Sequence, residues 1–210
     1  MKRVLLLFVV LAVFVCPISA QEALSKEDVQ AALDSGKAKA KKKCKDIGLN
    51  LWDWVGYAGV YHQVWIYTPR AWVEHQACEA TLENRDVSLT EADGQPVLRV
   101  HVIPGSVPKE ARISNSPCPS LRTVALADGA RMNLLRPQSE EKPTVLMPSK
   151  YDWVPMNCQM IVAEFSLSEV SALRALTPNA EFLVYVLDET ARAPQEVLWR
   201  VRERNFKKLM

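Results

Sequence analysis

Hydrophobic and polar residues alternate most clearly between positions 60 and 67, in the stretch VYHQVWIY. A period of two with aromatic and β-branched side chains predicts a β-strand. Thr68 and Pro69 follow, and they are typical of a helix N-cap and of the first helical position. The next segment, RAWVEHQACEATLENR, is apolar around much of its circumference at helical spacing. It predicts a helix over about 69–84 that is buried against a sheet.

The rest of the chain after position 84 has the pattern of antiparallel strands. EFLVYVLD is apolar on both faces and predicts a central strand, whereas QEVLWRVRER alternates as a half-exposed strand does. Asp128 and Gly129 lie between two apolar runs and predict a two-residue hairpin turn, because both tolerate positive φ. Many short strands separated by turns indicate a sandwich or a barrel. We therefore predict an α+β fold, mainly antiparallel β: a β-sandwich-like domain with one buried helix.

Two segments before this domain have a different character. SKEDVQAALDS, at 25–35, predicts a short N-terminal helix that Ser25 caps and Gly36 ends. Six lysines follow between positions 37 and 45. They suit either a polybasic patch for an anionic lipid or polysaccharide surface, or a solvated linker extended by charge repulsion, and the linker is favoured. The predicted organisation is a signal peptide at 1–20, the helix and Lys-rich linker at 21–45, and one domain at 46–210.

The first twenty residues, MKRVLLLFVVLAVFVCPISA, have the pattern of a cleavable secretory signal peptide. Lys2 and Arg3 precede twelve residues without a polar side chain, a run too short to span a bilayer. We therefore expect a secreted or periplasmic protein with no integral membrane span after cleavage. An acyl anchor at Cys16 is the weaker alternative, because Val15 is not the small residue that such processing normally requires.

Charge argues against nucleic acid as a partner. The chain has 26 Lys plus Arg and 24 Asp plus Glu, and Lys2 and Arg3 lie in the predicted signal peptide, which leaves 24 of each sign. Proteins that bind nucleic acid normally carry a basic excess or a basic face. The chain also lacks the GxSxG, GxxxxGK[ST] and GxGxxG motifs, which disfavours α/β-hydrolases and nucleotide enzymes. The expected partner is a protein or an envelope glycan.

Four cysteines follow the predicted signal peptide: Cys44, Cys78, Cys118 and Cys158. An even number in an exported chain predicts two disulfides. Three connectivities are possible, and we favour the pairs that are neighbours along the chain, Cys44 with Cys78 and Cys118 with Cys158. Each pair would close a loop worth on the order of 4 kcal/mol in chain entropy.

The histidines offer a second kind of chemistry. His75 and Cys78 lie three positions apart on the predicted helix, so both can reach one point. Zinc would need two further ligands, and a Cys78 nucleophile activated by His75 is the other alternative. A disulfide at Cys78 is favoured over both, so we expect no metal and no cofactor. We predict that His62, on an apolar strand face, is a hydrogen-bonded, partly buried core residue, and that His101 lies on a solvated face that it shares with Arg99.

Aromatic residues are dense between Trp52 and Trp72, where seven of the sixteen in the chain lie. Exposed tryptophans on a sheet make a platform for sugars or a patch for a protein, although filling the contact between helix and sheet is the simpler interpretation. The candidate binding residues are Trp52, Trp54, Tyr61, Trp65 and Tyr67.

The predicted function is a non-enzymatic exported module that binds a protein or a cell-envelope component, with no catalytic residue assigned. This prediction depends on the signal peptide, the antiparallel pattern, the cysteines and the missing catalytic motifs. The first alternative is a carbohydrate-binding module or glycan-active enzyme that uses the aromatic cluster. The second is a metal or thiol site at His75 and Cys78.

Overall fold

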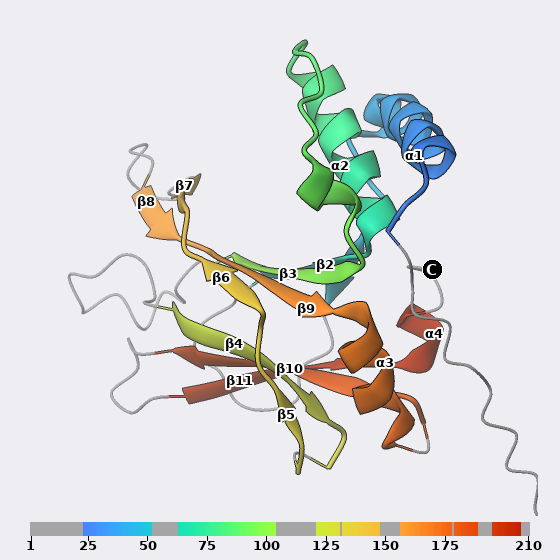
Figure 1. Ribbon diagram of the computed structural model, residues 1–210. Helices are drawn as coiled ribbons and strands as arrows, with labels where there is room; N and C mark the ends of the chain where they lie inside the picture. Colours follow the sequence, from blue (N-terminus) through green and yellow to red (C-terminus); the bar gives the residue numbers. More distant parts are fainter. Residues whose placement is uncertain are drawn as a thin grey trace, which may run out of the picture.

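The computed structural model describes residues 23–51, 63–103, 121–130, 132–147, 156–177, 179–188 and 195–206 (Figure 1). The helices in these ranges are α1 (Lys26–Lys39), α2 (Pro69–Leu82), α3 (Leu167–Ala175) and α4 (Glu203–Phe206), with the 3-10 turns η1 (Ala40–Lys42) and η2 (Glu91–Gly94). The strands are β1 (Leu49–Leu51), β2 (Gln63–Tyr67), β3 (Val97–Ile103), β4 (Leu121–Asp128), β5 (Leu134–Leu135), β6 (Ser139–Glu141), β7 (Thr144–Met147), β8 (Met156–Gln159), β9 (Ile161–Ser166), β10 (Phe182–Asp188) and β11 (Gln195–Val201).

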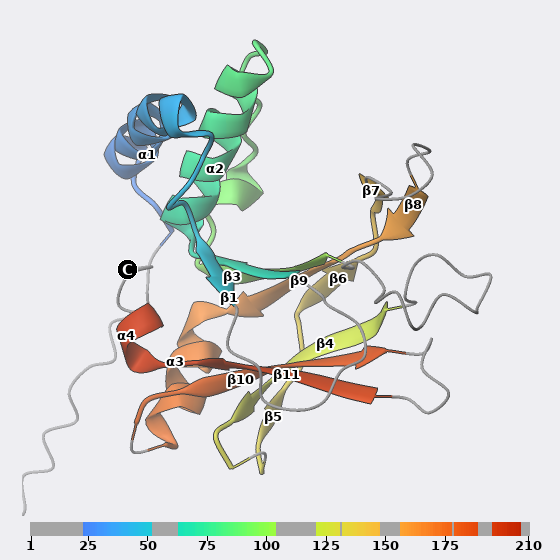
Figure 2. The same ribbon diagram turned by 180° about the vertical axis from the view of Figure 1, so that it is seen from behind.

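Two antiparallel sheets face each other (Figures 1 and 2). The five-stranded sheet has the order β1-β2-β3-β9-β6, the four-stranded sheet has the order β11-β10-β4-β5, and β7 and β8 form a separate pair. Neither sheet closes into a barrel, and every strand pair among the described residues is antiparallel. The predicted α+β, mainly antiparallel fold is therefore confirmed, as is the central place of β10 between β11 and β4.

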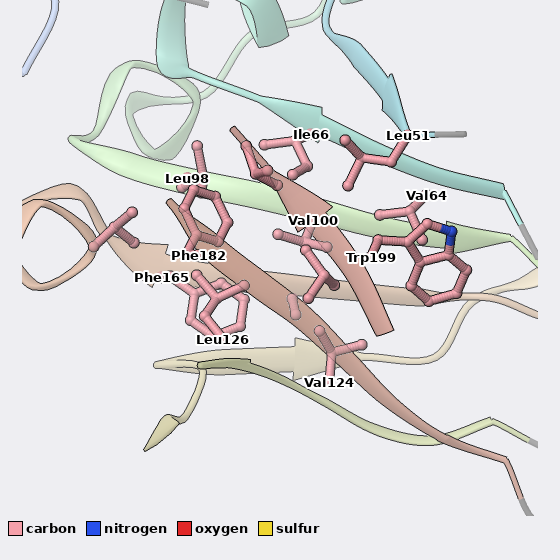
Figure 3. Close-up of a cluster of buried hydrophobic side chains, with 14 of the residues drawn as sticks. Leu51, Val64, Ile66, Leu98, Val100, Val124, Leu126, Phe165, Phe182 and Trp199 are labelled. Carbon is pink, nitrogen blue, oxygen red and sulfur yellow. The ribbon is translucent and has the colours of Figure 1, made fainter. Parts of the chain in front are cut away.

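The core lies between the two sheets and is built by the period of two along each strand (Figure 3). Val64 and Ile66 of β2 point inward, and Trp199 of β11 is the largest fully buried side chain among the described residues. Each fully buried Val, Leu, Ile or Phe contributes roughly 1.5–3 kcal/mol. The alternate residues of β2 and β3 point to the outer face of the five-stranded sheet, where Trp65 lies opposite His101 and Tyr67 opposite Arg99.

Helices α1 and α2 pack against each other on the outer side of the five-stranded sheet (Figures 1 and 2). Strands β1 and β2 lie between them along the chain, and we call the packed pair of helices the α1–α2 hairpin. Both N-caps are as predicted: the Ser25 hydroxyl accepts the Asp28 amide at 3.1 Å, and the Thr68 hydroxyl accepts the Ala71 amide at 3.4 Å, with Pro69 at the start of α2. The prediction for 69–84 is confirmed, because α2 ends at Leu82 and buries one side.

The prediction that Gly36 ends the first helix is wrong. Gly36 lies inside α1 where the two helices cross, and a Cβ there would be 2.2 Å from the Glu74 carbonyl oxygen. The glycine is needed for close approach and not for a left-handed turn. The chain stays helical through α1 and η1 as far as Lys42, so most of the predicted lysine linker is not extended.

The hairpin predicted at Asp128 and Gly129 forms between β4 and β5, but its loop is longer than two residues. The last paired position is Ala127 with Leu134. The Asp128 carboxylate closes the loop by accepting the Met132 amide at 2.8 Å, the Asn133 amide at 3.3 Å and the Asn133 side-chain amide at 2.8 Å. A buried carboxylate therefore replaces the tight turn.

A contact between the sheets involves the edge strand β6. The Glu140 carboxylate accepts hydrogen bonds from the Thr123 hydroxyl at 3.0 Å and from the Val124 amide at 3.1 Å, both in β4. The ladder between β4 and β5 contains Leu126 and Ala127 and does not reach Val124. Glu140 thus satisfies a backbone donor of β4 outside that ladder.

The predicted disulfide between Cys44 and Cys78 is present and joins the end of the α1 segment to α2. Cys158 is also disulfide-bonded, and its partner lies outside the described residues, as does Cys118. The predicted signal peptide and Cys16 lie outside them too. Within the described ranges, no helix is both long enough and apolar enough to cross a membrane.

Candidate functional site

The base of the α1–α2 hairpin rests on a group of aromatic and basic side chains, which we call the His–aromatic cluster: Tyr67, Trp72, His75, Arg99 and His101. Tyr67 and Arg99 are 3% exposed, and His101 is 8% exposed. The Tyr67 ring centroid is 5.6 Å from Trp72, 4.8 Å from His75 and 5.1 Å from His101. Trp72 is also 5.1 Å from His101, in an edge-to-face arrangement. These contacts attach the first turns of α2 to β2 and β3.

Arg99 connects four elements through its guanidinium. Its Nε donates to Glu164 of β9 at 2.9 Å, and its two terminal nitrogens donate to the carbonyls of Asp93 at 3.3 Å and Ala92 at 2.7 Å in η2. The guanidinium also lies 5.3 Å from the Trp72 ring centroid, within the range of a cation–π contact. A buried arginine with this many partners is well compensated for desolvation.

Asp93 strengthens the same junction from η2. Its carboxylate accepts the Trp72 indole N–H at 2.6 Å and the Thr90 amide at 2.6 Å. Burial acts to raise the pKa of Asp93, but the hydrogen bonds from Thr90 and Trp72 and the charge of Arg99 outweigh it, so the pKa is lowered. Asp93 is therefore ionised at neutral pH and holds Trp72 in place.

His101 is the unusual member of the cluster, and the prediction that it lies on a solvated face is wrong. The first turns of α2 and η2 cover this part of the sheet, so His101 and Arg99 are both buried. Burial, followed by the positive charges of His75 and Arg99, lowers the pKa of His101 to about 3. The imidazole is therefore neutral at physiological pH, and its Nε2 has no hydrogen-bond partner among the described residues.

His75 lies above His101 on α2. Its Nδ1 is also buried without a hydrogen bond within the part of the chain that the structure describes. The nearest carboxylate oxygen, on Glu79, is 3.7 Å away, which is too far for a hydrogen bond. The two histidines thus bring two unpartnered nitrogens to the contact between helix and sheet.

Of the aromatic residues predicted as a binding site, the structure describes Trp65 and Tyr67. Trp65 is half-buried and stacks on Tyr67 with a centroid distance of 6.3 Å and an interplanar angle of 10°. Burial, with a smaller contribution from Glu79, raises the pKa of Tyr67. Tyr67 therefore faces the helix–sheet contact and not solvent. Trp52, Trp54, Tyr61 and His62 lie outside the described residues.

Cys78 is bonded to Cys44, so its sulfur is neither a thiol nor a thiolate ligand in this structure. Among the described residues, no group of three His, Cys, Asp or Glu side chains converges as a metal site would require. His75 and Cys78 are separate in their roles: the histidine faces the cluster, and the cysteine joins the two helices.

A second feature lies where the hairpin turns toward β1. We call it the lysine corner: Lys37, Lys41, Lys42, Lys43 and Lys45. All five are exposed and form no ion pair with any residue that the structure describes. The sixth lysine of the run, Lys39, instead pairs with the nearly buried Glu74 at 2.5 Å.

The lysine corner has a defined backbone turn that the disulfide and a buried side chain hold in place. Lys43, Cys44 and Asp46 have positive φ values of 55°, 56° and 70°, a conformation that non-glycine residues adopt rarely. The disulfide then holds the turn against α2, and Ile47 is buried beneath it. Because the turn is fixed, its lysines project from a defined surface and not from an extended chain.

Sequence reasoning found the lysines and the disulfide but missed the role of Arg99 and His101. The only signal for these two was their position in an otherwise apolar strand, VLRVHVI, which does not reveal what covers the outer face. No protein-family model matches the chain, and no curated protein and no solved structure is significantly similar to it. A functional proposal must therefore be argued from the His–aromatic cluster and the lysine corner themselves.

Proposed function

We propose that this protein is a secreted or periplasmic, non-enzymatic β-sandwich module that binds an anionic envelope glycan through the lysine corner. The observation that carries the proposal is the set of five exposed lysines of the lysine corner, which form no ion pair with any described residue and lie at and beside a turn fixed by the Cys44–Cys78 disulfide. The disulfide also supports an oxidising compartment, as the N-terminal sequence does.

Local charge density supports a polyanion as partner. Six lysines and one acid, Asp46, lie between positions 37 and 46, although residues 21–210 carry equal numbers of both signs. Charges within a Debye length of about 8–10 Å act together, so the corner presents a positive potential that the rest of the molecule does not. A lysine near a strongly anionic surface is worth about 1 kcal/mol, which puts five lysines at a few kcal/mol in total.

Rigidity adds to this attraction. A flexible basic tail loses conformational entropy when it binds, whereas the lysine corner has its backbone already ordered by the disulfide and by buried Ile47. The side chains still lose rotamer freedom, so the binding is of moderate affinity and sensitive to salt. Phosphate and carboxylate groups on a glycan chain are the chemistry that suits these ammonium groups.

The test compares binding to a phosphomannan with binding to the neutral mannan of the same length. A triple variant of the corner, with Lys41, Lys42 and Lys43 each changed to Gln, should weaken phosphomannan binding at least tenfold at low salt. The matched control changes three exposed cations elsewhere, Lys26, Arg136 and Arg204, to Gln and removes the same charge. We expect less than a threefold loss in the control.

Three results would contradict the proposal. Equal losses in the two triple variants would mean that net charge and not the corner determines binding. Equal binding to phosphomannan and neutral mannan would remove the anion from the explanation. Tighter binding to vesicles of phosphatidylglycerol and phosphatidylcholine than to phosphomannan would identify a lipid surface in place of the glycan.

A further inference from the structure

The α1–α2 hairpin is attached to the sandwich at its base. The first turns of α2 contact the sheet through the His–aromatic cluster, while the far end of α2 projects away and leaves Leu82 52% exposed (Figures 1 and 2). The disulfide and the close crossing at Gly36 make α1 and α2 one unit. The stability of this unit on the sheet therefore depends on the few side chains at its base.

Among the side chains where the helices meet the sheet, His101 is the one for which protonation is least favourable. Its buried Nε2 has no hydrogen-bond partner among the described residues, and the Trp72 ring lies 5.1 Å away. An imidazolium at this position would keep its charge in a desolvated site beside the fixed positive charge of Arg99. We propose that the base of the hairpin is an acid-sensitive latch, in which protonation of His101 releases α1, α2 and η2 from the five-stranded sheet.

The titratable groups that act on His101 directly are Tyr67 from β2, Arg99 from β3 and His75 from α2. The nearby carboxylates, on α2, η2 and β9, contact the neighbours of His101 and not His101 itself. The carboxylates are already engaged: Glu164 binds Arg99, Asp93 binds Trp72, and Glu79 lies beside His75. Arg99 and His75 both disfavour a charged imidazole at His101.

The direction of the pH effect follows from linkage. A histidine exposed to water has a pKa of about 6.5, whereas burial holds that of His101 at about 3. The open state therefore binds a proton that the closed state does not, and it is favoured as pH falls below 6.5. Between pH 7.5 and pH 5 the opening constant should increase by about 30-fold, a factor determined by the pKa of the open state.

This inference does not depend on the lysine corner or on its ligand. It predicts a second form of the protein at acidic pH, in which the outer faces of β2 and β3 become accessible. Tyr67, which is buried in the closed form, would then meet solvent together with Trp65 and Trp72, which are only partly exposed there.

Hydrogen exchange on the full chain, followed by mass spectrometry, tests the latch. Protection factors for α2 and η2 should fall by about 30-fold between pH 7.5 and pH 5, and at pH 5 their opening free energy should lie below that of β4 and β10. If α2 and β10 exchange with the same free energy at pH 5, the hairpin does not open separately and the proposal is wrong. Unchanged protection of α2 would overturn it as well.

Two histidine variants identify the group responsible. His101→Gln removes the buried imidazole and should abolish the pH dependence of α2 protection. His75→Gln leaves the His101 imidazole in place and should retain most of that pH dependence. An unaltered response in His101→Gln would assign the effect to another group and refute the latch. If His101→Gln does not fold, the comparison of α2 with β10 in the wild-type protein still decides the question.

Discussion

Replacing Gly36 by alanine isolates the packing of α1 on α2. In an isolated helix this substitution stabilises by about 1 kcal/mol, because alanine loses less backbone entropy than glycine. In this protein the added Cβ would lie 2.2 Å from the Glu74 carbonyl oxygen and 2.7 Å from the Ala77 Cβ. Helix propensity thus predicts that the added methyl group stabilises the protein, whereas packing predicts that it destabilises the protein.

The packing term should exceed the propensity term. Ordinary carbon–oxygen contacts begin at about 3.3 Å, so the helices would have to separate by about 1 Å. A backbone oxygen cannot rotate away, and overpacking of this kind costs about 1–3 kcal/mol. The separation also disturbs buried Ala32 and the ion pair between Lys39 and Glu74. Taking the upper end and subtracting the propensity gain leaves a net loss of about 2 kcal/mol.

Urea unfolding followed by circular dichroism measures this loss, and Ala31→Gly is the matched control. Ala31 is exposed on α1, so its replacement should cost about 1 kcal/mol through propensity alone. Faster trypsin cleavage at the lysines of 37–45 should accompany Gly36→Ala, because α1 would pack less tightly. A Gly36→Ala protein as stable as the wild type, or more stable, would refute the close crossing of the two helices.

Three further changes test other parts of the structure. Replacing Cys44 and Cys78 together by alanine should lower the free energy of unfolding by about 4 kcal/mol, because the disulfide closes a loop with a sequence separation of 34 residues. A loss below about 1 kcal/mol in urea unfolding would contradict this. Asp128→Ala should cost about 2 kcal/mol by leaving the β4–β5 loop donors unpaired, and equal stability of the variant would argue against that role. The free energy of unfolding of the wild type should fall by about 2 kcal/mol from pH 7.5 to pH 5, because unfolded His101 takes up a proton that the folded form excludes; His101→Gln should show a smaller fall.

Periodicity predicted the elements that depend on local patterns. The alternation before Thr68, the N-cap and Pro69 located β2 and α2, because cap chemistry and strand alternation act within a few residues. The Cys44–Cys78 pairing was also predicted, but the sequence allowed two other connectivities, so spatial proximity had to decide it.

The features that the sequence did not reveal depend on contacts between distant segments. Gly36 resembles a helix terminator when α1 is considered alone, and its role becomes evident only against Glu74. His101 and Arg99 resemble the solvated face of a strand until α2 and η2 cover them. Local polarity indicates which face of a strand carries polar groups, but not whether a helix later packs on that face.

The carboxylate of Glu140 has a consequence for self-association. Unpaired strand edges attract other chains, and β6 is a three-residue edge of the five-stranded sheet. Glu140 points inward from this edge and occupies the Val124 amide of β4, a donor that an added strand would otherwise use. A chain pairing there would have to displace a charged group from its hydrogen bonds and leave it desolvated. One acidic side chain thus protects the β6 edge and the neighbouring part of β4 against fibril-like growth.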